Sequence, residues 1–315
     1  MDHETTRVRL ETGGGDPDEA QHRLSLLYNG DEWSASPTRC AFSYRYAAIG
    51  DGAMTLRSSK MTGRLVGGTG HPDDIVVQWI VSGRARVDIA RDAIEMELGR
   101  PVLFPVGRSF AFDFVDYDQR LVHLSRPAVE RTAAEKGLLG PLRFDHHHRA
   151  SAATVQKWRE AVSATSRSLR AERMDPLHWD ELTRSTIGAL LELYPPDATP
   201  LPPEVLLPRN ARLRAAIEFV HARAAEPIGP TEVAAAAGLS VRGLQSAFQR
   251  ALGMRPIAYI RLARLDHAHA DLALGSPHTT TVAEVARRWG FGNAGRFSAA
   301  YVSRFGELPS ATLQS

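Results

Sequence analysis

The sequence is short of features that mark exported, membrane-spanning or disulfide-bonded proteins. Its 315 residues contain one cysteine, Cys40, and one thiol cannot form an internal disulfide or a thiolate metal cluster. No apolar run approaches the ~18 residues that a membrane-spanning helix needs. The N-terminal segment also has no apolar signal core. These absences predict a cytoplasmic protein.

Signatures of catalysis are missing as well. The sequence has no Gly-rich phosphate loop, no G-x-S-x-G motif and no carboxylates paired at catalytic spacing. His71 and His123 are candidates for a barrel interior, but no His-x-His pair is followed closely by Glu, as metal-binding cupin enzymes require. The run His146–His148 suggests metal binding, yet consecutive residues do not share one face, so we expect an exposed loop. We therefore predict no enzyme activity, no metal and no cofactor.

Lysine is absent from the C-terminal third. Residues 208–315 contain 13 Arg, no Lys and seven acidic residues, a net charge of +6, whereas the remainder carries −4. A basic third beside a mildly acidic remainder favours a polyanion partner for that third alone. A solvated basic face would give the same charge.

Proline divides the chain. Six prolines lie within residues 194–208, which excludes an α-helix there and predicts an extended linker at 195–208. Residues 40–125 contain short alternating or apolar runs separated by Gly, Pro and Asp, a pattern typical of a β-barrel or sandwich. We expect a disordered tail over residues 1–22 and one domain over 23–194.

Near the end of that domain, the spacing of the apolar residues changes from a strand-like to a helical period. Residues 151–194 predict two helices appended to the barrel. In the second helix, one face carries Leu182, Thr186, Leu190 and Leu193. Such a face either packs on the barrel or forms a homodimer interface, and the sequence leaves both possibilities open.

Capping residues mark the helix ends of the C-terminal third. Asn210 is placed to cap its first helix, and Ser240 and Asn293 to cap later ones. Thr281 and Glu284 have the spacing of a capping box. These signals predict an all-α domain.

The same region contains a repeated arrangement. Segments 230–253 and 281–306 each consist of a short helix, a glycine, an apolar residue, a capping residue and a longer helix. This order predicts two helix-turn-helix units within a domain spanning 209–315. A long helix over 256–274 is expected to join them.

The longer helix of each unit has two contrasting faces. In the first unit, we expect these residues to face inward: Val241, Leu244, Ala247, Phe248 and Ala251. In the second unit, the residues expected inside are Ala294, Phe297, Ala300, Tyr301 and Phe305. The outward stripes carry no acidic residue, as a helix in the major groove of DNA requires.

Arginine suits guanine and glutamine suits adenine, so the outward stripes predict DNA binding. We expect Arg242 and Gln245 to read bases and Arg250 and Arg255 to touch phosphates. The full set of predicted DNA contacts is Ser240, Arg242, Gln245, Ser246, Gln249, Arg250, Arg255, Asn293, Arg296, Ser298, Ala299 and Ser303.

Residues 209–315 resemble the DNA-binding domain of the AraC/XylS family of bacterial transcription regulators. The resemblance rests on "LSVRGLQSAFQRALGMRPIAYIRLARLDHAHADL" and "VAEVARRWGFGNAGRFSAAYVSRFGELPSA". It covers about a third of the chain and implies promoter DNA and RNA polymerase as partners. More weakly, "VVQWIVSGRARV" and "LGRPVLFPVGRSFAFDF" resemble the cupin-like sensor domains that precede this domain.

The sequence departs from the family pattern in the second unit. Gly292 stands where the family usually has Ser, Ala299 where it usually has Arg, and Tyr301-Val302 replaces the common Phe followed by a basic residue. The second recognition helix is therefore poor in polar groups. We expect it to make fewer base contacts than the first, with Arg296 as its main reader.

These observations predict an α+β multidomain protein with a cupin-like β-barrel, a helical appendage and an all-α DNA-binding domain. We expect a transcription regulator, in particular an effector-responsive activator acting as a homodimer. The candidate effector-binding residues are Arg45, Gln78, Trp79 and Arg86. The alternatives are a cupin-type metal enzyme with a DNA-binding tail and an architectural DNA binder without an effector.

Overall fold

The structure, a computed structural model, describes residues 8–28, 30–70, 74–169, 175–198, 200–277 and 279–314. The described residues of 1–132 and 144–196 form one compact unit, and those of 133–143 and 197–315 form a second. No helix in the described part is both long enough and apolar enough to cross a membrane.

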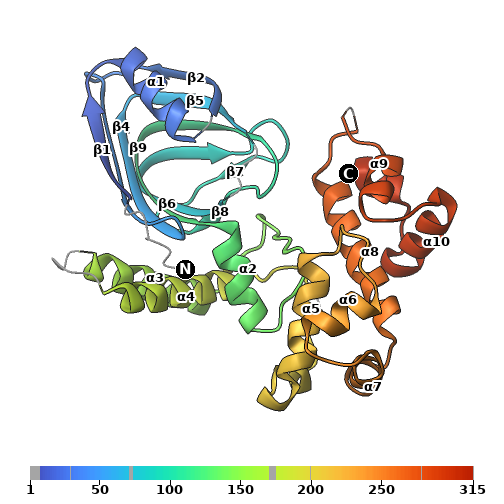
Figure 1. Cartoon of the computed structure of the whole chain (residues 1–315). Coiled ribbons are helices and arrows are strands. Elements are labelled where there is room, and N and C mark those ends of the chain that lie inside the picture. Colours follow the sequence, from blue (N-terminus) through green and yellow to red (C-terminus); the bar gives the residue numbers. More distant parts are fainter. Residues whose placement is uncertain are drawn as a thin grey trace. The chain divides into compact units, whose positions relative to one another are not determined.

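The first unit is built on a curved antiparallel sheet (Figure 1). In chain order its elements are β1 (Val8–Gly14), α1 (Pro17–Tyr28), β2 (Gly30–Ser36), β3 (Ser43–Gly50), β4 (Met54–Thr62), β5 (Arg64–Thr69), β6 (Ile75–Val87), β7 (Ile94–Glu95), β8 (Val102–Leu103) and β9 (Phe110–Leu124). Strand β9 pairs with β6 along one edge and with both β4 and β5 along the other. The sheet therefore curls into a half-barrel, and the predicted strands between 40 and 125 are confirmed.

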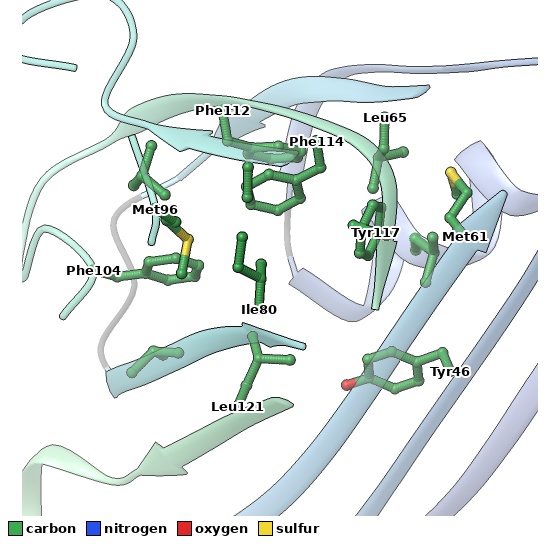
Figure 2. Packing of buried hydrophobic residues seen from close by; sticks show 14 of the residues in the cluster. Tyr46, Met61, Leu65, Ile80, Met96, Phe104, Phe112, Phe114, Tyr117 and Leu121 are labelled. Atoms are coloured by element: carbon green, nitrogen blue, oxygen red, sulfur yellow. The ribbon is translucent and has the colours of Figure 1, made fainter. Parts of the chain in front are cut away.

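Side chains fill the interior of the half-barrel. Strand residues alternate between its two faces, and aromatic and apolar residues from β3, β4, β6 and β9 meet on the inner face (Figure 2). Phe112 stacks on Phe114, and Phe114 meets Tyr117 edge to face. The cavity left among these rings is about 20 Å³, room for little more than one water molecule.

The expected disordered tail is wrong for residues 8–22. Strand β1 pairs with β3 along its whole length, and α1 buries Ala20 and Leu24 in the core of the half-barrel. The segment itself is polar and rich in glycine, so its order comes from partners distant in sequence. Residues 1–7 of the predicted tail lie outside the described residues.

Three helices follow the sheet: α2 (Arg126–Glu135), α3 (Ala152–Ser168) and α4 (Pro176–Leu193). The helices predicted within 151–194 are thus confirmed. The α4 face containing Leu182, Thr186 and Leu190 is buried, and the Thr186 hydroxyl lies 3.2 Å from that of Thr165 on α3. Because this face packs inside the unit, it is not free to form the predicted dimer interface.

The proline-rich segment is not the extended linker that we expected. It forms two 3-10 turns, η1 (Pro203–Leu206) and η2 (Pro208–Asn210), and buries Leu201 and Val205 in the core of the second unit. The Leu201 N–H donates to the Gly137 carbonyl at 2.8 Å. Proline excludes an α-helix but permits these turns, and the apolar residues between the prolines supply the burial.

The second unit continues with helices alone: α5 (Ala211–Ala222), α6 (Pro230–Ala236), α7 (Val241–Leu252), α8 (Pro256–Leu274), α9 (Val282–Arg288), α10 (Ala294–Phe305) and α11 (Pro309–Gln314). Helix α8 serves two hydrophobic cores. Its first half contributes Ile260 and Ala263 to a core shared with α5, α6 and α7. Its second half contributes Leu265 and Leu272 to a core shared with α9, α10 and α11.

Most of the predicted caps are confirmed. The side chains of Ser240 and Asn293 accept backbone N–H bonds at the starts of α7 and α10, and Thr281 forms a capping box with Glu284. Asn210 was predicted wrongly, because its side chain makes no cap bond. Its amide instead donates to the Glu204 carbonyl at 2.7 Å.

Candidate nucleic-acid interface

Helices α6 and α7 form the first helix-turn-helix unit. Gly238 turns the chain between them with φ +63°, a left-handed conformation that glycine adopts without cost. The Leu239 N–H then donates to the Ala234 carbonyl at 2.9 Å, and Leu239 packs against the core. Leu244 and Phe248 are fully buried, so the core fixes the rotation of α7 about its axis.

The opposite face of α7 is open to solvent. It presents Arg242, Gln245, Ser246 and Gln249, all exposed as expected. Val241 was expected to face inward but is 38% exposed. It is the first residue of the helix and lies beyond the edge of the core, where helical periodicity does not ensure burial.

Helices α9 and α10 repeat this arrangement. Gly290 has φ +76°, and the N–H of the next residue, Phe291, donates to the Ala286 carbonyl at 2.8 Å. Phe297 and Tyr301 are fully buried, and the rings of Phe291 and Phe297 lie 5.0 Å apart. Each unit therefore has a glycine turn, an apolar residue at the corner and a capped second helix.

The exposed face of α10 is less polar than that of α7. Arg296, Ala299 and Ser303 are exposed as expected, whereas Ser298 is half-buried. Ala294 was expected inside but is exposed, because it is also the first residue of its helix. The stripe available on α10 thus contains one long polar side chain.

Two of the predicted contact residues also hold the backbone. Ser240 Oγ accepts the Gly243 N–H at 3.0 Å, and Asn293 Oδ1 accepts the Arg296 N–H at 2.9 Å. These bonds use one acceptor site on each side chain. A further role for either residue must involve its remaining donors or lone pairs.

The arginines within residues 197–315 of the C-terminal compact unit fall into two groups. Arg304 binds Asp266 with both Nε and Nη2, and Arg288 binds Asp271 at 2.9 Å. Among the described residues, no side-chain partner is found for the exposed arginines Arg242, Arg250, Arg255 and Arg296. The same is true of two arginines that the sequence analysis did not select, Arg261 on α8 and Arg287 on α9. Their exposure depends on the fold, so charge alone could not single them out.

Among the described residues of this unit, positive charge comes from arginine rather than histidine. Burial, with a smaller effect from His267, lowers the pKa of His221 to about 4, and its Nε2 lies 3.0 Å from the Tyr259 hydroxyl. Burial also lowers the pKa of His267 and of His269. These three rings are therefore neutral at pH 7, and none of them adds to the positive charge that a polyanion meets near neutral pH.

Arg264, on α8, links the segment that follows α5 to the turn of the second helix-turn-helix unit. Its guanidinium donates to the carbonyls of Ala224 and Glu226, which follow α5, at 2.9 and 2.6 Å. A Cβ added to Gly290 would lie 3.1 Å from Arg264 Nη1. One side chain therefore holds the end of α5 and packs closely against the turn of the second unit.

The predicted effector residues do not come together. Gln78 is buried inside the half-barrel, where its Nε2 lies 2.9 Å from Met96 Sδ, whereas Trp79 points to the outer face. Arg45 and Arg86 are exposed and pair with Glu11 and Asp113, respectively.

The candidate barrel histidines have separate outcomes. His71 lies outside the described residues, whereas His123 is buried in the half-barrel. Burial lowers the pKa of His123 to about 4, and its Nδ1 lies 3.7 Å from Asp74. His123 is therefore neutral at pH 7.

The histidine run lies in a loop as expected, with His147 and His148 exposed, but two of its residues come together against our expectation. His146 and His147 converge with Asp88, and one potential ligand atom from each lies within 4.8 Å of the others. Consecutive histidines can therefore meet when they occupy a turn rather than a helix or strand. The Arg108 guanidinium binds both oxygens of Asp88 and lies 3.3 Å from His146 Nε2. Arginine already neutralises this carboxylate, and we assign no metal here.

Comparisons with known proteins point to the C-terminal region. A family model described as a helix-turn-helix domain matches residues 233–315. The probable thc operon regulatory protein of Rhodococcus erythropolis is 38% identical over 113 residues, which cover 36% of this chain and 33% of that protein. XylDLEGF operon transcriptional activator 2 of Pseudomonas putida is 35% identical over 97 residues, covering 31% of this chain and 62% of that protein. The chain thus spans less than two thirds of either relative.

Two solved structures are also similar. A probable AraC family transcriptional regulator from Rhodopseudomonas palustris is 40% identical, with a TM-score of 0.31, covering 33% of this chain and 94% of that chain. The AraC-like transcriptional activator CuxR is 14% identical, with a TM-score of 0.47, covering 84% of this chain and 96% of that chain.

The two glycines that flank Phe291 should respond differently to a methyl group. Gly290→Ala should lower the free energy of unfolding of the C-terminal compact unit by about 1–2 kcal/mol. Alanine disfavours the left-handed conformation, and its Cβ would crowd Arg264. Gly292→Ala is the matched control, since its Cβ would meet nothing within 4 Å. It should be neutral or stabilise by up to about 1 kcal/mol. Urea denaturation of both variants measures this, and equal losses would contradict the role given to Gly290.

Proposed function

We propose that this chain, whose C-terminal region belongs to the AraC/XylS-type helix-turn-helix domains, is a sequence-specific DNA-binding transcription regulator. Its partner is double-stranded promoter DNA, contacted by α7 and α10. The observation that carries the proposal is the presence of two capped helices, α7 and α10. In each helix, buried aromatic residues fix which face points to the core, so that arginine without a side-chain partner faces solvent.

Helix α8 supports binding by both units at once. Its 19 residues correspond to about 28 Å at ~1.5 Å per residue. Successive major-groove segments on one face of DNA are ~34 Å apart. The proposal therefore places α7 and α10 in neighbouring major-groove segments of one operator, with α8 as the spacer.

In the same proposal, the N-terminal compact unit is a cupin-like sensor that binds a small effector. Activation through RNA polymerase, a cytoplasmic site of action and a homodimeric state belong to the same proposal. The names of the Pseudomonas putida relatives as transcriptional activators favour positive control. Because the α4 face is buried, a homodimer must use another surface. The relatives compared above are regulators, which favours this function over a cupin-type enzyme.

The full-length chain should bind its own promoter DNA with an affinity that falls steeply as salt rises. Each phosphate neutralised by an arginine contributes a slope of about −0.9 to log K against log salt. The full chain is used because a fragment starting at residue 205 would lose Leu201 and its partner segment 133–143. Fluorescence anisotropy at 50–200 mM salt measures the slope. An affinity independent of salt would refute DNA binding through these arginines.

Arg242→Ala and Arg250→Ala should weaken DNA binding in different ways. Loss of a base reader should cost about 1–3 kcal/mol at the preferred operator and relax the preference at one position. Loss of Arg250 should weaken all sequences alike and make the salt slope shallower by about 0.9. Arg223→Ala is the control, because Arg223 already pairs with Glu226. Binding to a panel of operator variants separates these outcomes, and uniform weakening by Arg242→Ala would contradict base reading.

The two recognition helices should read DNA unequally. Alanine can touch a thymine methyl, but it cannot form the paired hydrogen bonds that discriminate bases by ~1–3 kcal/mol. Selection from randomised sites should yield a sharp half-site under α7 and a diffuse one under α10. The single sharp position under α10 should be a guanine that disappears in Arg296→Ala. Two equally sharp half-sites would show that another face of α10 meets the DNA.

A further inference from the structure

The proposed function requires an effector site, and the half-barrel interior has little space for one. Its cavity of about 20 Å³ lies among Leu24, Tyr28 and Trp33 and is closed by aromatic rings from β9. Sites for organic ligands usually enclose about 300–1,000 Å³. A ligand inside would therefore have to displace packed side chains.

The outer face of the same sheet bears a groove of about 630 Å³, bounded on its other side by α3. Strand pairing places the floor residues in two rows across the sheet. One row runs through Glu11, Ala47, Ser58, Arg120 and Trp79. The neighbouring row contributes Arg9, Ile49 and Leu56 to the floor and continues past the groove to Val122 and Val77.

The groove results from the sizes of the side chains in these rows. Ala47 and Ser58 are small and lie on the central strands, whereas Trp79 stands at one end of their row. Ile49 and Leu56 give the floor an apolar stretch beside them. Val162 and Leu169 of the α3 segment supply apolar wall opposite the sheet. The result is a groove with apolar stretches on its floor and on its α3 wall, and with an indole at one end.

The uncompensated charges around the groove are positive. Glu11 is already paired with Arg45, and Arg120 is paired with Asp118. Among the described residues, Arg9 from β1 and Arg167 from α3 have no ion-pair partner. One unpaired guanidinium group thus comes from the sheet and the other from α3, and either could bind a carboxylate or another oxyanion by charge-assisted hydrogen bonds.

We propose that this groove binds a small organic anion with a flat apolar body. The body lies on Ala47 and Ser58 beside the Trp79 indole, and the anionic group pairs with Arg167 or Arg9. This inference rests on the proposed function, since it assigns the effector site to the outer face of the sensor. A ligand there contacts the sheet and α3 together, so its binding fixes α3 against the sheet.

The test uses the full-length chain with 2-naphthoate as probe and neutral 2-naphthamide as its uncharged counterpart. Calorimetry should show that naphthoate binds and that the amide binds at least about tenfold more weakly, because it cannot form the charge-assisted bonds. Equal binding of the two compounds, or no binding of naphthoate, overturns the proposal.

Two variants locate the probe without disturbing the core. Arg167→Gln removes one exposed guanidinium and should weaken naphthoate binding about tenfold. Ser58→Tyr fills the centre of the groove and should abolish binding. Arg84→Gln is the matched control, because Arg84 is an exposed arginine of β6 outside the groove, and it should bind as wild type does. Circular dichroism melting curves check that each variant is folded.

Three outcomes would overturn the assignment. Naphthoate binding that survives both groove variants but is lost in Gln78→Leu would place the anion inside the half-barrel, where Gln78 is fully buried and its Nε2 lies 2.9 Å from Met96 Sδ. A dimer seen by light scattering and dissociated by Ser58→Tyr would make the groove an interface between two copies. Binding unaffected by any of these variants would place the probe elsewhere.

Anisotropy with promoter DNA on the same samples separates this proposal from the proposed function. DNA binding without naphthoate binding refutes only the groove site. Naphthoate binding without DNA binding refutes the regulator function and leaves an anion site in the groove.

Discussion

Helix α8 belongs to two hydrophobic cores at once, and the arrangement of the C-terminal unit depends on that shared burial. Ile260 is fully buried in the first core, and Leu272 is fully buried in the second. Each such side chain contributes about 1.5–3 kcal/mol when it leaves water. Ion pairs also fix the orientation of the neighbouring helices on α8, since Asp266 binds Arg304 of α10 and Asp271 binds Arg288 of α9. The recognition helices are thus oriented by one common element rather than by each other.

Buried and exposed residues alternate sharply along α7, because one face of the helix packs on the core and the other faces solvent. Phe248 is fully buried and fixes the helix, whereas its neighbour Gln249 is exposed and free to vary without affecting the core. The same logic holds for Phe297 and Arg296 on α10. Substitutions on the exposed face can therefore change its chemistry while the buried face keeps the fold.

The features that could be predicted from sequence are those determined within a few residues. The caps at Ser240 and Asn293 and the glycine turns depend on neighbours three to five positions away. The order of β1 could not be predicted, because it comes from β3, about thirty-five residues later. The groove beside Trp79 was equally hidden, because Glu11, Ala47, Ser58 and Arg120 become neighbours only through strand register. Burial at the first residue of a helix, as at Val241, depends on where the core ends.

Residues 133–143 give the chain an unusual path, because they leave the first unit at Thr132 and the chain returns to it at Phe144. Their packing partners include Leu201 and Leu206, which lie in the proline-rich segment some sixty residues further along. The two units are therefore interleaved in sequence, and no single crossover point separates them. Recombination that joined a different first unit at residue 196 would separate 133–143 from the proline-rich segment that it packs against. Exchange of the first unit in evolution must therefore carry a compatible version of 133–143, which couples the evolution of the two units.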